Sequence, residues 1–248
     1  MNPLISIITV TYQAGKTLEK SIISVINQKL QFDYIIIDGG SNDETINIIN
    51  KYCDKISYWV SEPDNGIYDA MNKGLSKASG EWIYFLGADD ILEDDALLNI
   101  KPYLRYPYLM VCGDIIFDTG HHVRSFLNNR IWLQNTVHHQ ATFYKRILFH
   151  AFKYDVSYKA IADYELNLKI FVNGYSFLYV PLTLARCKSN GISSQMKISL
   201  VETNLIREKF LGKGYNQKLL SSLLRVYYFQ KEIRSYLKDI FTFTVTII

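Results

Sequence analysis

Two adjacent carboxylates follow a short apolar run in the first half of the chain. Residues 82–86 (WIYFL) have the composition of a buried strand, and Asp89 and Asp90 come shortly after it. Charged groups at the carboxyl edge of a sheet lie where open α/β folds bind their ligands. Mg²⁺ and Mn²⁺ prefer carboxylate and phosphate oxygens. The pair therefore predicts a site where a divalent cation bridges the protein and a diphosphate.

Further acidic residues stand at predicted strand ends or in loops, among them Asp38 and Asp69. A nucleotide sugar presents a base, a ribose, a diphosphate and a hexose, and each needs its own partner. Carboxylates can accept hydrogen bonds from a base imide and from sugar hydroxyls. A divalent cation must neutralise the diphosphate, because charge on the leaving group grows in the transition state. These residue types fit the transfer of a sugar from a nucleotide.

Strands and helices that could position these residues alternate along the first 95 residues. Strands are expected at residues 5–11, 34–37, 56–60 and 82–86, and helices at 17–27, from 41 onward, and at 67–78. Alternation at such short spacing favours a parallel, doubly wound α/β sheet.

The pattern changes after about residue 95, where Gly and Asp interrupt short β-like pieces. Such pieces are expected at 109–113, 115–118, 123–126 and 140–144, followed by a helix over 161–172. No linker rich in Pro, Gly or Ser intervenes, so the second half should continue the first sheet. We predict a domain over 1–200, with a nucleotide-binding half (about 1–95) and an acceptor-binding half (about 96–200). A C-terminal amphipathic helical extension should cover 201–248.

The composition excludes several classes of protein. A hydrophobic content of 48% suffices for a full core, and a net charge of +3 is too small to indicate nucleic-acid binding. The cysteines Cys53, Cys112 and Cys187 lie far apart, which fits a reducing compartment and argues against a zinc site. The N-terminus lacks the positive charge of a signal peptide, and no apolar run reaches the ~18 residues of a membrane span. These features predict a cytoplasmic protein.

Several blocks of the chain together resemble one known family. They are residues 6–12 (SIITVTY), 35–43 (IIIDGGSND), 61–74 (SEPDNGIYDAMNKG), 80–90 (GEWIYFLGADD), 139–142 (HQAT) and 162–165 (ADYE). Over about residues 4–190 the chain resembles the inverting glycosyltransferases of family 2, of the bacterial surface-polysaccharide type (O-antigen, capsule or colanic acid). The resemblance implies the GT-A fold, a Rossmann-like and mostly parallel sheet flanked by helices.

The resemblance also implies roles for single positions. Thr11 and Tyr12 match the loop that borders the nucleoside, and Asp38 matches the carboxylate that reads the uracil. The nucleotide and donor sugar would be lined by Asp69, Asn72 and Lys73.

The acidic motif and the later blocks complete the implied site. Asp89 matches the residue that contacts ribose or sugar, and Asp90 matches the metal ligand. The motif reads Ala88-Asp89-Asp90 and not the Asp-x-Asp often written for the fold, so Asp90 alone is expected to ligate Mn²⁺ or Mg²⁺. Asp163 resembles the catalytic base, which removes the proton of the attacking acceptor hydroxyl. His139 and Gln140 would border the donor or acceptor pocket.

The implied activity is transfer of a hexose or N-acetylhexosamine from a nucleotide sugar, a UDP-sugar above all. The acceptor would be a lipid-linked oligosaccharide of O-antigen or exopolysaccharide synthesis, and inversion of an α-linked donor would give a β-linkage. Two alternatives stay open. The chain could be a non-catalytic module that binds a sugar nucleotide or a partner protein. Single residues could also be structural, with Asp38 in a turn and Asp163 as a helix cap.

The last segment has apolar residues at helical spacing, including Leu220, Leu223 and Leu224, with Lys218 and Arg225 among them. A basic amphipathic helix of this kind can lie on an anionic membrane. It can equally cover the sheet or form a homodimer contact. Membrane contact would make the enzyme peripheral on the cytoplasmic face of the inner membrane.

Overall fold

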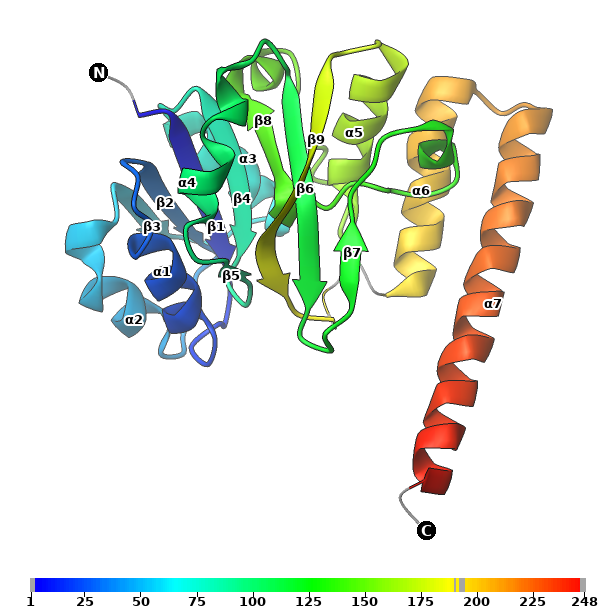
Figure 1. Ribbon diagram of the computed structural model, residues 1–248, viewed down its shortest axis with the longest axis horizontal. Helices are drawn as coiled ribbons and strands as arrows, with labels where there is room; N and C mark the ends of the chain where they lie inside the picture. The colour runs from blue at the N-terminus through cyan, green and yellow to red at the C-terminus, as the bar shows by residue number, and fades with distance from the viewer. Residues whose placement is uncertain (1–2, 190, 192–194, 246–248) are drawn as a thin grey trace.

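The computed structural model describes residues 3–189, 191 and 195–245, which form a mixed sheet with helices on both faces (Figure 1). The strands are β1 (Ile5–Thr11), β2 (Asp33–Asp38), β3 (Tyr58–Ser61), β4 (Trp82–Gly87), β5 (Ile91–Leu92), β6 (Met110–Phe117), β7 (His122–Arg124), β8 (Thr142–Lys145) and β9 (Phe177–Cys187). The α-helices are α1 (Leu18–Ile26), α2 (Thr45–Lys51), α3 (Ile67–Lys77), α4 (Ala96–Ile100), α5 (Ala162–Val172), α6 (Met196–Leu211) and α7 (Tyr215–Val245).

The first four strands have the parallel arrangement that the sequence predicts. β1 pairs in parallel with β2 and β4, and β2 pairs in parallel with β3. Helices cover both faces of β1, β2 and β4, which are mostly apolar and buried along almost their whole length, whereas β3 at the edge of the sheet is only half-buried. Val10 pairs with Gly87 at the carboxyl ends of β1 and β4. The residues that follow these two strands therefore meet at one edge of the sheet.

The second half continues the same sheet, which confirms the predicted continuity and the α/β fold class. The strand order is β3-β2-β1-β4-β8-β6-β9-β5, and β7, which is not part of this order, pairs with β6. β8 runs antiparallel to both β4 and β6, and β9 runs parallel to β6. This half is mixed because β8 enters between two strands that run the other way.

One strand was predicted as two pieces. Residues 109–113 and 115–118 belong to the single strand β6, whose register with β9 shifts around Asp114. Gly and Asp are depleted in strands, so Gly113 and Asp114 indicated a break. A Cβ atom at Gly113 would lie 2.5 Å from the carbonyl oxygen of Leu182 on β9. Glycine here allows the close approach of β9, a strand that the sequence pattern did not reveal.

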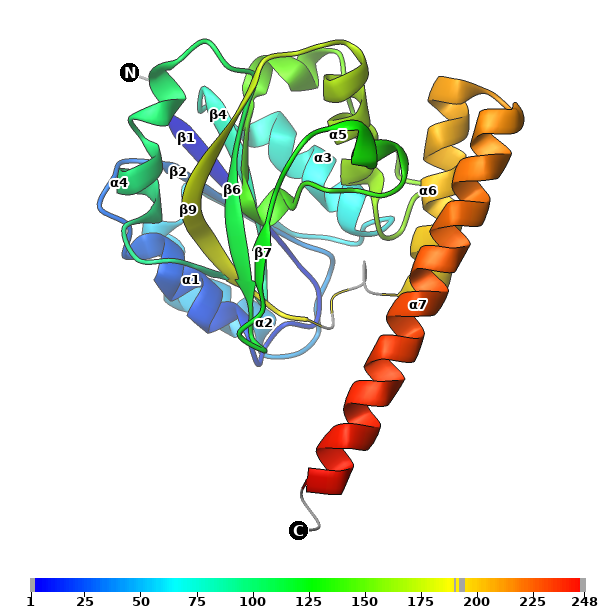
Figure 2. The ribbon, with the colours of Figure 1, turned by 45° about the vertical axis from the view of Figure 1, so that its right-hand side comes forward.

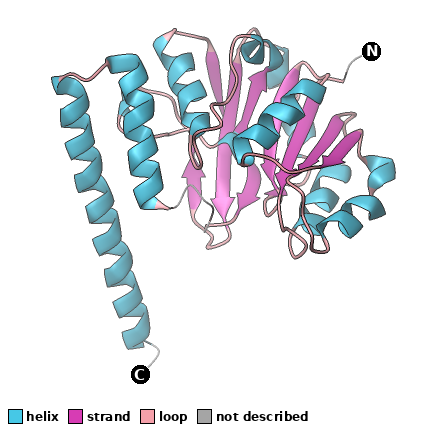
Figure 3. Cartoon of the chain, turned by 180° about the vertical axis from the view of Figure 1, so that it is seen from behind, coloured by secondary structure: helices cyan, strands magenta, loops and turns pink. Residues whose placement is uncertain are grey.

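Two apolar layers fix the helices to the sheet. α1, α2 and α4 bury their apolar residues in one layer, whereas α3, α5 and α6 contribute to the other. Figure 3 shows the sheet from behind, with helices in front of and beside the strands. The second layer matters for function, because α3 and α5 carry residues of the site described below.

α6 joins the domain, and α7 packs on α6. The Arg207 guanidinium, which is fully buried, donates from Nη1 to the carbonyl oxygen of Trp132 at 3.0 Å. Leu224 of α7 is also fully buried, and the Ser221 hydroxyl donates to Oδ1 of Asn204 at 2.8 Å. α6 crosses residue 200, where the domain boundary was predicted, and residues 246–248 of the predicted extension lie outside the described part.

The far part of α7 leaves the domain. It extends past the sheet edge at which β6 and β9 end (Figures 1 and 2). Within the described residues, no helix is both long and apolar enough to cross a bilayer.

Candidate active site

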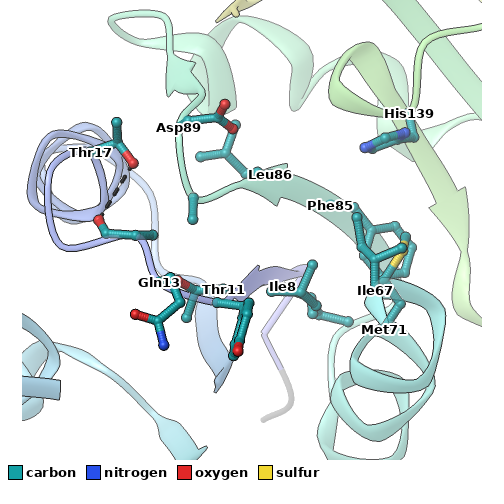
Figure 4. Close-up of a pocket in the computed structure, with 15 residues that line it drawn as sticks. Ile8, Thr11, Gln13, Thr17, Ile67, Met71, Phe85, Leu86, Asp89 and His139 are labelled. Atoms are coloured by element: carbon teal, nitrogen blue, oxygen red, sulfur yellow. Dashed lines mark hydrogen bonds between the residues drawn. The ribbon is translucent and has the colours of Figure 1, made fainter. Parts of the chain in front are cut away.

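A cavity of about 360 Å³ opens at the carboxyl edge of β1 and β4. Its volume lies in the range of small-molecule sites. Four of the predicted site residues line it: Thr11, Tyr12, Asp89 and His139. Figure 4 shows Asp89 and His139 on one side of the opening and Thr11 on the other. The cavity therefore joins the loops after β1 and β4 to the later part of the chain.

The acidic pair sits in a tight turn directly after β4. The Asp90 backbone N–H donates to the Gly87 carbonyl oxygen at 3.2 Å. A Cβ atom at Gly87 would lie 2.6 Å from Oδ2 of Asp90, so a larger residue there would displace the carboxylate. Asp89 is exposed and lines the cavity, whereas Asp90 is 3% exposed. The two neighbours thus present one solvated and one buried carboxylate.

Both oxygens of Asp90 have a protein donor. The Gln140 amide donates to Oδ2 at 3.2 Å, and the backbone N–H of Lys188 donates to Oδ1 at 3.3 Å. Burial raises the pKa of Asp90, and the nearby negative charge of Asp89 raises it further. Burial also raises the pKa of the adjacent Cys187 thiol, with the charge of Asp90 as a further cause.

A divalent cation fits this pair of carboxylates. Each carboxylate oxygen has two lone pairs, so one bonded donor leaves room for a metal. A cation beside Asp90 would offset the two causes that disfavour its charged form, which are burial and the charge of Asp89. The described residues contain no cluster of three His, Cys, Asp or Glu ligands. The remaining ligands would therefore be phosphate and water oxygens, as is usual for Mg²⁺.

Asp163 lies in the first turn of α5 and is 6% exposed. Its Oδ2 accepts a hydrogen bond from the Asn135 amide at 2.9 Å and lies 3.5 Å from Nδ1 of His139. Asn135 is itself held, because its Oδ1 accepts from the Asn167 amide at 3.1 Å. The N-cap of α5 is Ile161 and not Asp163. The Asp163 carboxylate is thus oriented by polar side chains and does not cap its helix.

A short 3-10 helix, His139–Ala141, brings the two buried carboxylates together. Its consecutive residues contact different partners, His139 with Asp163 and Gln140 with Asp90. Because His139 also lines the cavity, the cavity, the acidic turn and the start of α5 form one site. Asp90 and Asp163 are far apart in the chain, and nothing in their spacing indicates that the fold brings them to one site.

Asp38 lies apart from the cavity lining. Its side chain is fully buried, and Oδ2 accepts from the backbone N–H groups of Gly40 and Ser41 and from the Ser61 hydroxyl. Its Oδ1 accepts from the Ser41 hydroxyl at 2.5 Å. These bonds close the turn after β2 and hold the Asp38 carboxylate in the interior.

Three predicted donor residues of α3 also lie outside the lining. Lys73 pairs with Glu62 at 2.9 Å and lies 3.7 Å from Asp69. The Asn72 amide donates to the carbonyl oxygen of Tyr154 at 2.8 Å and accepts from its N–H at 3.0 Å. The cavity is lined instead by Ile67 and Met71 of the same helix (Figure 4). Asn72 docks α3 against a later segment of the chain.

The family model for "Glycosyl transferase family 2" matches residues 6–163. The chain belongs to this family. The match includes the acidic turn, the 3-10 helix and Asp163, and it confirms that the chain is a family 2 glycosyltransferase.

Known proteins agree with this assignment. A PGL/p-HBAD biosynthesis glycosyltransferase of Mycobacterium bovis is 30% identical over 221 residues, which cover 85% of this chain and 84% of that protein. The structure of S. aureus TarS 1–349 in complex with UDP-GlcNAc superposes with a TM-score of 0.68 at 15% identity, covering 89% of this chain and 71% of that one. The Pyrobaculum calidifontis mannosyltransferase PcManGT, in complex with GDP-Man and Mn²⁺, gives 0.66 at 18% identity, covering 90% and 70%. These likenesses confirm the GT-A type of fold.

Sequence reasoning missed two polar residues of this glycosyltransferase site. Gln13 lines the cavity, its backbone N–H donates to the Ser41 hydroxyl at 2.8 Å, and its amide donates to Asn42 at 2.7 Å. Neighbouring parallel strands end at one edge, so the polar residues after β2 could have indicated this contact. Asn135, which orients Asp163, carries no comparable signal, because the two residues are far apart in the chain.

Proposed function

We propose that this glycosyltransferase moves a hexose or N-acetylhexosamine from a UDP-sugar to a sugar acceptor with inversion, so that an α-linked donor gives a β-linked product. The observation that carries the proposal is the contact of consecutive residues, His139 and Gln140, with Asp163 and Asp90 beside one cavity. A base and a metal ligand held next to each other can serve the two ends of one displacement, the attacking hydroxyl and the departing diphosphate.

Asp163 acts in this proposal as the base. Asn135 and His139 both approach Oδ2, so we assign Oδ1 to the acceptor hydroxyl. The hydroxyl loses its proton to the carboxylate as it attacks the anomeric carbon from the face opposite the nucleotide. Asn135 and the buried surroundings keep the carboxylate aimed and exclude water, which favours attack by the acceptor over hydrolysis.

The donor occupies the cavity in this proposal. Thr11 and Tyr12 border the nucleoside, and Asp89 accepts from ribose or sugar hydroxyls. Asp90 would hold Mn²⁺ or Mg²⁺, which neutralises charge on the departing nucleoside diphosphate. The remaining predicted donor residues are proposed to shape the cavity from behind, through the turn after β2 and through α3: Asp38, Asp69, Asn72 and Lys73.

UDP binding measured by calorimetry with and without Mn²⁺ tests the donor proposal. We expect binding that strengthens when Mn²⁺ is present, because a cation between Asp90 and the diphosphate offsets the repulsion of like charges. The UDP-GlcNAc of TarS and the GDP-Man with Mn²⁺ of PcManGT make UDP and GDP the first two nucleotides to compare.

Binding to GDP or dTDP in place of UDP would correct the nucleotide. Binding without turnover on any sugar acceptor would favour the alternative, a non-catalytic sugar-nucleotide-binding module.

The acceptor proposal rests on the helix α7. Five large apolar side chains on it are between 43% and 62% exposed: Leu219, Leu223, Val226, Phe229 and Ile233. Four of them have the spacing of one stripe along the helix: Leu219, Leu223, Val226 and Ile233. This stripe lies opposite to the buried Leu224. Residues 213–248 contain six Lys or Arg against two Asp or Glu, although the whole chain carries only +3. We propose that α7 lies on an anionic membrane, so that the enzyme is peripheral on the cytoplasmic face of that membrane. We propose further that the acceptor is a lipid-linked oligosaccharide of O-antigen or exopolysaccharide synthesis.

Cosedimentation with vesicles of phosphatidylethanolamine and phosphatidylglycerol tests this surface. The wild-type protein should pellet with the vesicles, and the triple variant Leu219→Ser/Leu223→Ser/Val226→Ser should stay in the supernatant. Ile147→Ser/Val172→Ser is the matched control, because these side chains are exposed to a similar degree on another part of the surface. A wild-type protein that stays in the supernatant contradicts the proposal. Loss of a dimer in the triple variant, seen by sedimentation velocity, would show that a second copy covers the stripe.

A further inference from the structure

The segment that leads into α5 is held by a side chain of α6. Buried backbone N–H groups need an acceptor. Three successive N–H groups, those of residues 159–161, donate to Glu202 of α6. We call this arrangement the amide cradle.

Both carboxylate oxygens of Glu202 accept these hydrogen bonds. Its Oε1 lies 2.6 Å from the backbone nitrogen of Lys159, and its Oε2 lies 3.0 Å from the nitrogens of both Ala160 and Ile161. The side chain is 6% exposed. A carboxylate at this end of a helix also interacts favourably with the helix dipole. Glu202 thus ties α6 to the segment that immediately precedes Asp163.

Tyr68 of α3 packs near the cradle. Its side chain is 3% exposed and belongs to the apolar cluster that also contains Ile161 and Ala162. Burial, followed by the charge of Asp163, raises the pKa of Tyr68, so the hydroxyl stays protonated. Tyr68 lies between Ile67 and Met71, the two α3 residues that line the cavity. This cluster therefore connects the donor cavity to the helix that carries Asp163.

We propose that Glu202 is a positioning residue that sets the direction of the Asp163 carboxylate, so that α6 is part of the catalytic machinery. This inference rests on the proposed role of Asp163 as the base. Asn135 and His139 hold the carboxylate itself, whereas the cradle holds the backbone from which it projects. A base must be placed within a fraction of an ångström of its productive position, because small displacements lower the rate strongly.

Hydrogen exchange gives the direct readout of the cradle. In Glu202→Gln the amides of residues 159–161 should exchange faster than in the wild-type protein, because the amide side chain keeps one acceptor oxygen and adds a donor. Glu208→Gln, on the same helix, is the matched control and should leave their exchange unchanged. Unchanged exchange in Glu202→Gln would overturn the inference, whatever the enzyme does.

Kinetics separate positioning from folding. Glu202→Gln should lower kcat roughly 10- to 100-fold, with UDP affinity and donor KM close to those of the wild-type protein. Glu202→Asp, which restores the carboxylate on a shorter side chain, should recover part of the lost kcat. A parallel fall of UDP affinity and kcat in Glu202→Gln would show general damage to the fold and overturn the inference. Two results together would separate this inference from the proposed base. If exchange at 159–161 were faster in Glu202→Gln while Asp163→Asn turned over normally, the hydrogen bonds of the cradle would be confirmed and the proposed base refuted.

Discussion

Asp163→Asn should keep nucleotide binding and lose sugar transfer. The substitution preserves size and leaves one oxygen to accept from the Asn135 amide, so the fold around α5 should persist. What disappears is the group that takes the proton of the acceptor hydroxyl. A positioned general base contributes roughly 10²- to 10⁴-fold to a rate, and we expect a loss of that size in kcat. Steady-state transfer assays and UDP calorimetry on the same preparation measure the two effects.

Glu165→Gln is the matched control for this experiment. Glu165 lies two residues further along α5 and pairs with Lys209 at 3.0 Å, away from the carboxylates of the site. The same change of carboxylate to amide there should alter kcat little. If Asp163→Asn turned over at the wild-type rate, the assignment of the base would be wrong.

Asp90→Asn should remove the effect of Mn²⁺ on UDP binding. The neutral side chain cannot supply the charge that a bridging cation needs, so the gain in affinity on adding Mn²⁺ should fall by at least about tenfold, or roughly 1.4 kcal/mol. The same variant should melt at an unchanged or higher temperature. Burial and the charge of Asp89 raise the pKa of Asp90, so its charged form carries a free-energy cost that asparagine does not carry.

Calorimetry and thermal unfolding of one protein preparation test both parts. Asp94→Asn, an exposed change four residues further on, is the control for the loss of one negative charge near the site. Mn²⁺-enhanced binding that persists in Asp90→Asn would contradict the assignment of Asp90. A lower melting temperature would show that Asp90 contributes more to the fold through Gln140 and Lys188 than its buried charge costs.

The first 95 residues could be predicted from local patterns. Their strands are continuous apolar runs and their helices have one apolar face, so periodicity locates both kinds of element. Strand β1 begins and ends where the sequence predicts. The acidic turn could be located for the same reason, since a buried strand directly precedes it.

The remaining parts depend on contacts between distant residues. β9 escaped prediction because its irregular pairing with β6 leaves no clean alternation of buried and exposed residues. The partners of Asp38 and Asn72 could not be inferred either. Each uses its polar atoms on backbone groups that only the folded chain brings near. The later candidate residues were predicted from the family resemblance, and the structure adds what orients them.

The strand order has a consequence for synthesis of the chain. β4 lies in the interior of the finished sheet, but its partner on one side is β8, which begins more than fifty residues later. While the ribosome makes the intervening residues, the apolar run of β4 has an unpaired edge of the kind that recruits other strands. Residues 1–95 contain the first four strands, yet released alone they would expose this edge permanently. A fragment cut there should aggregate, so the two halves of the sheet are expected to mature only as one translation product.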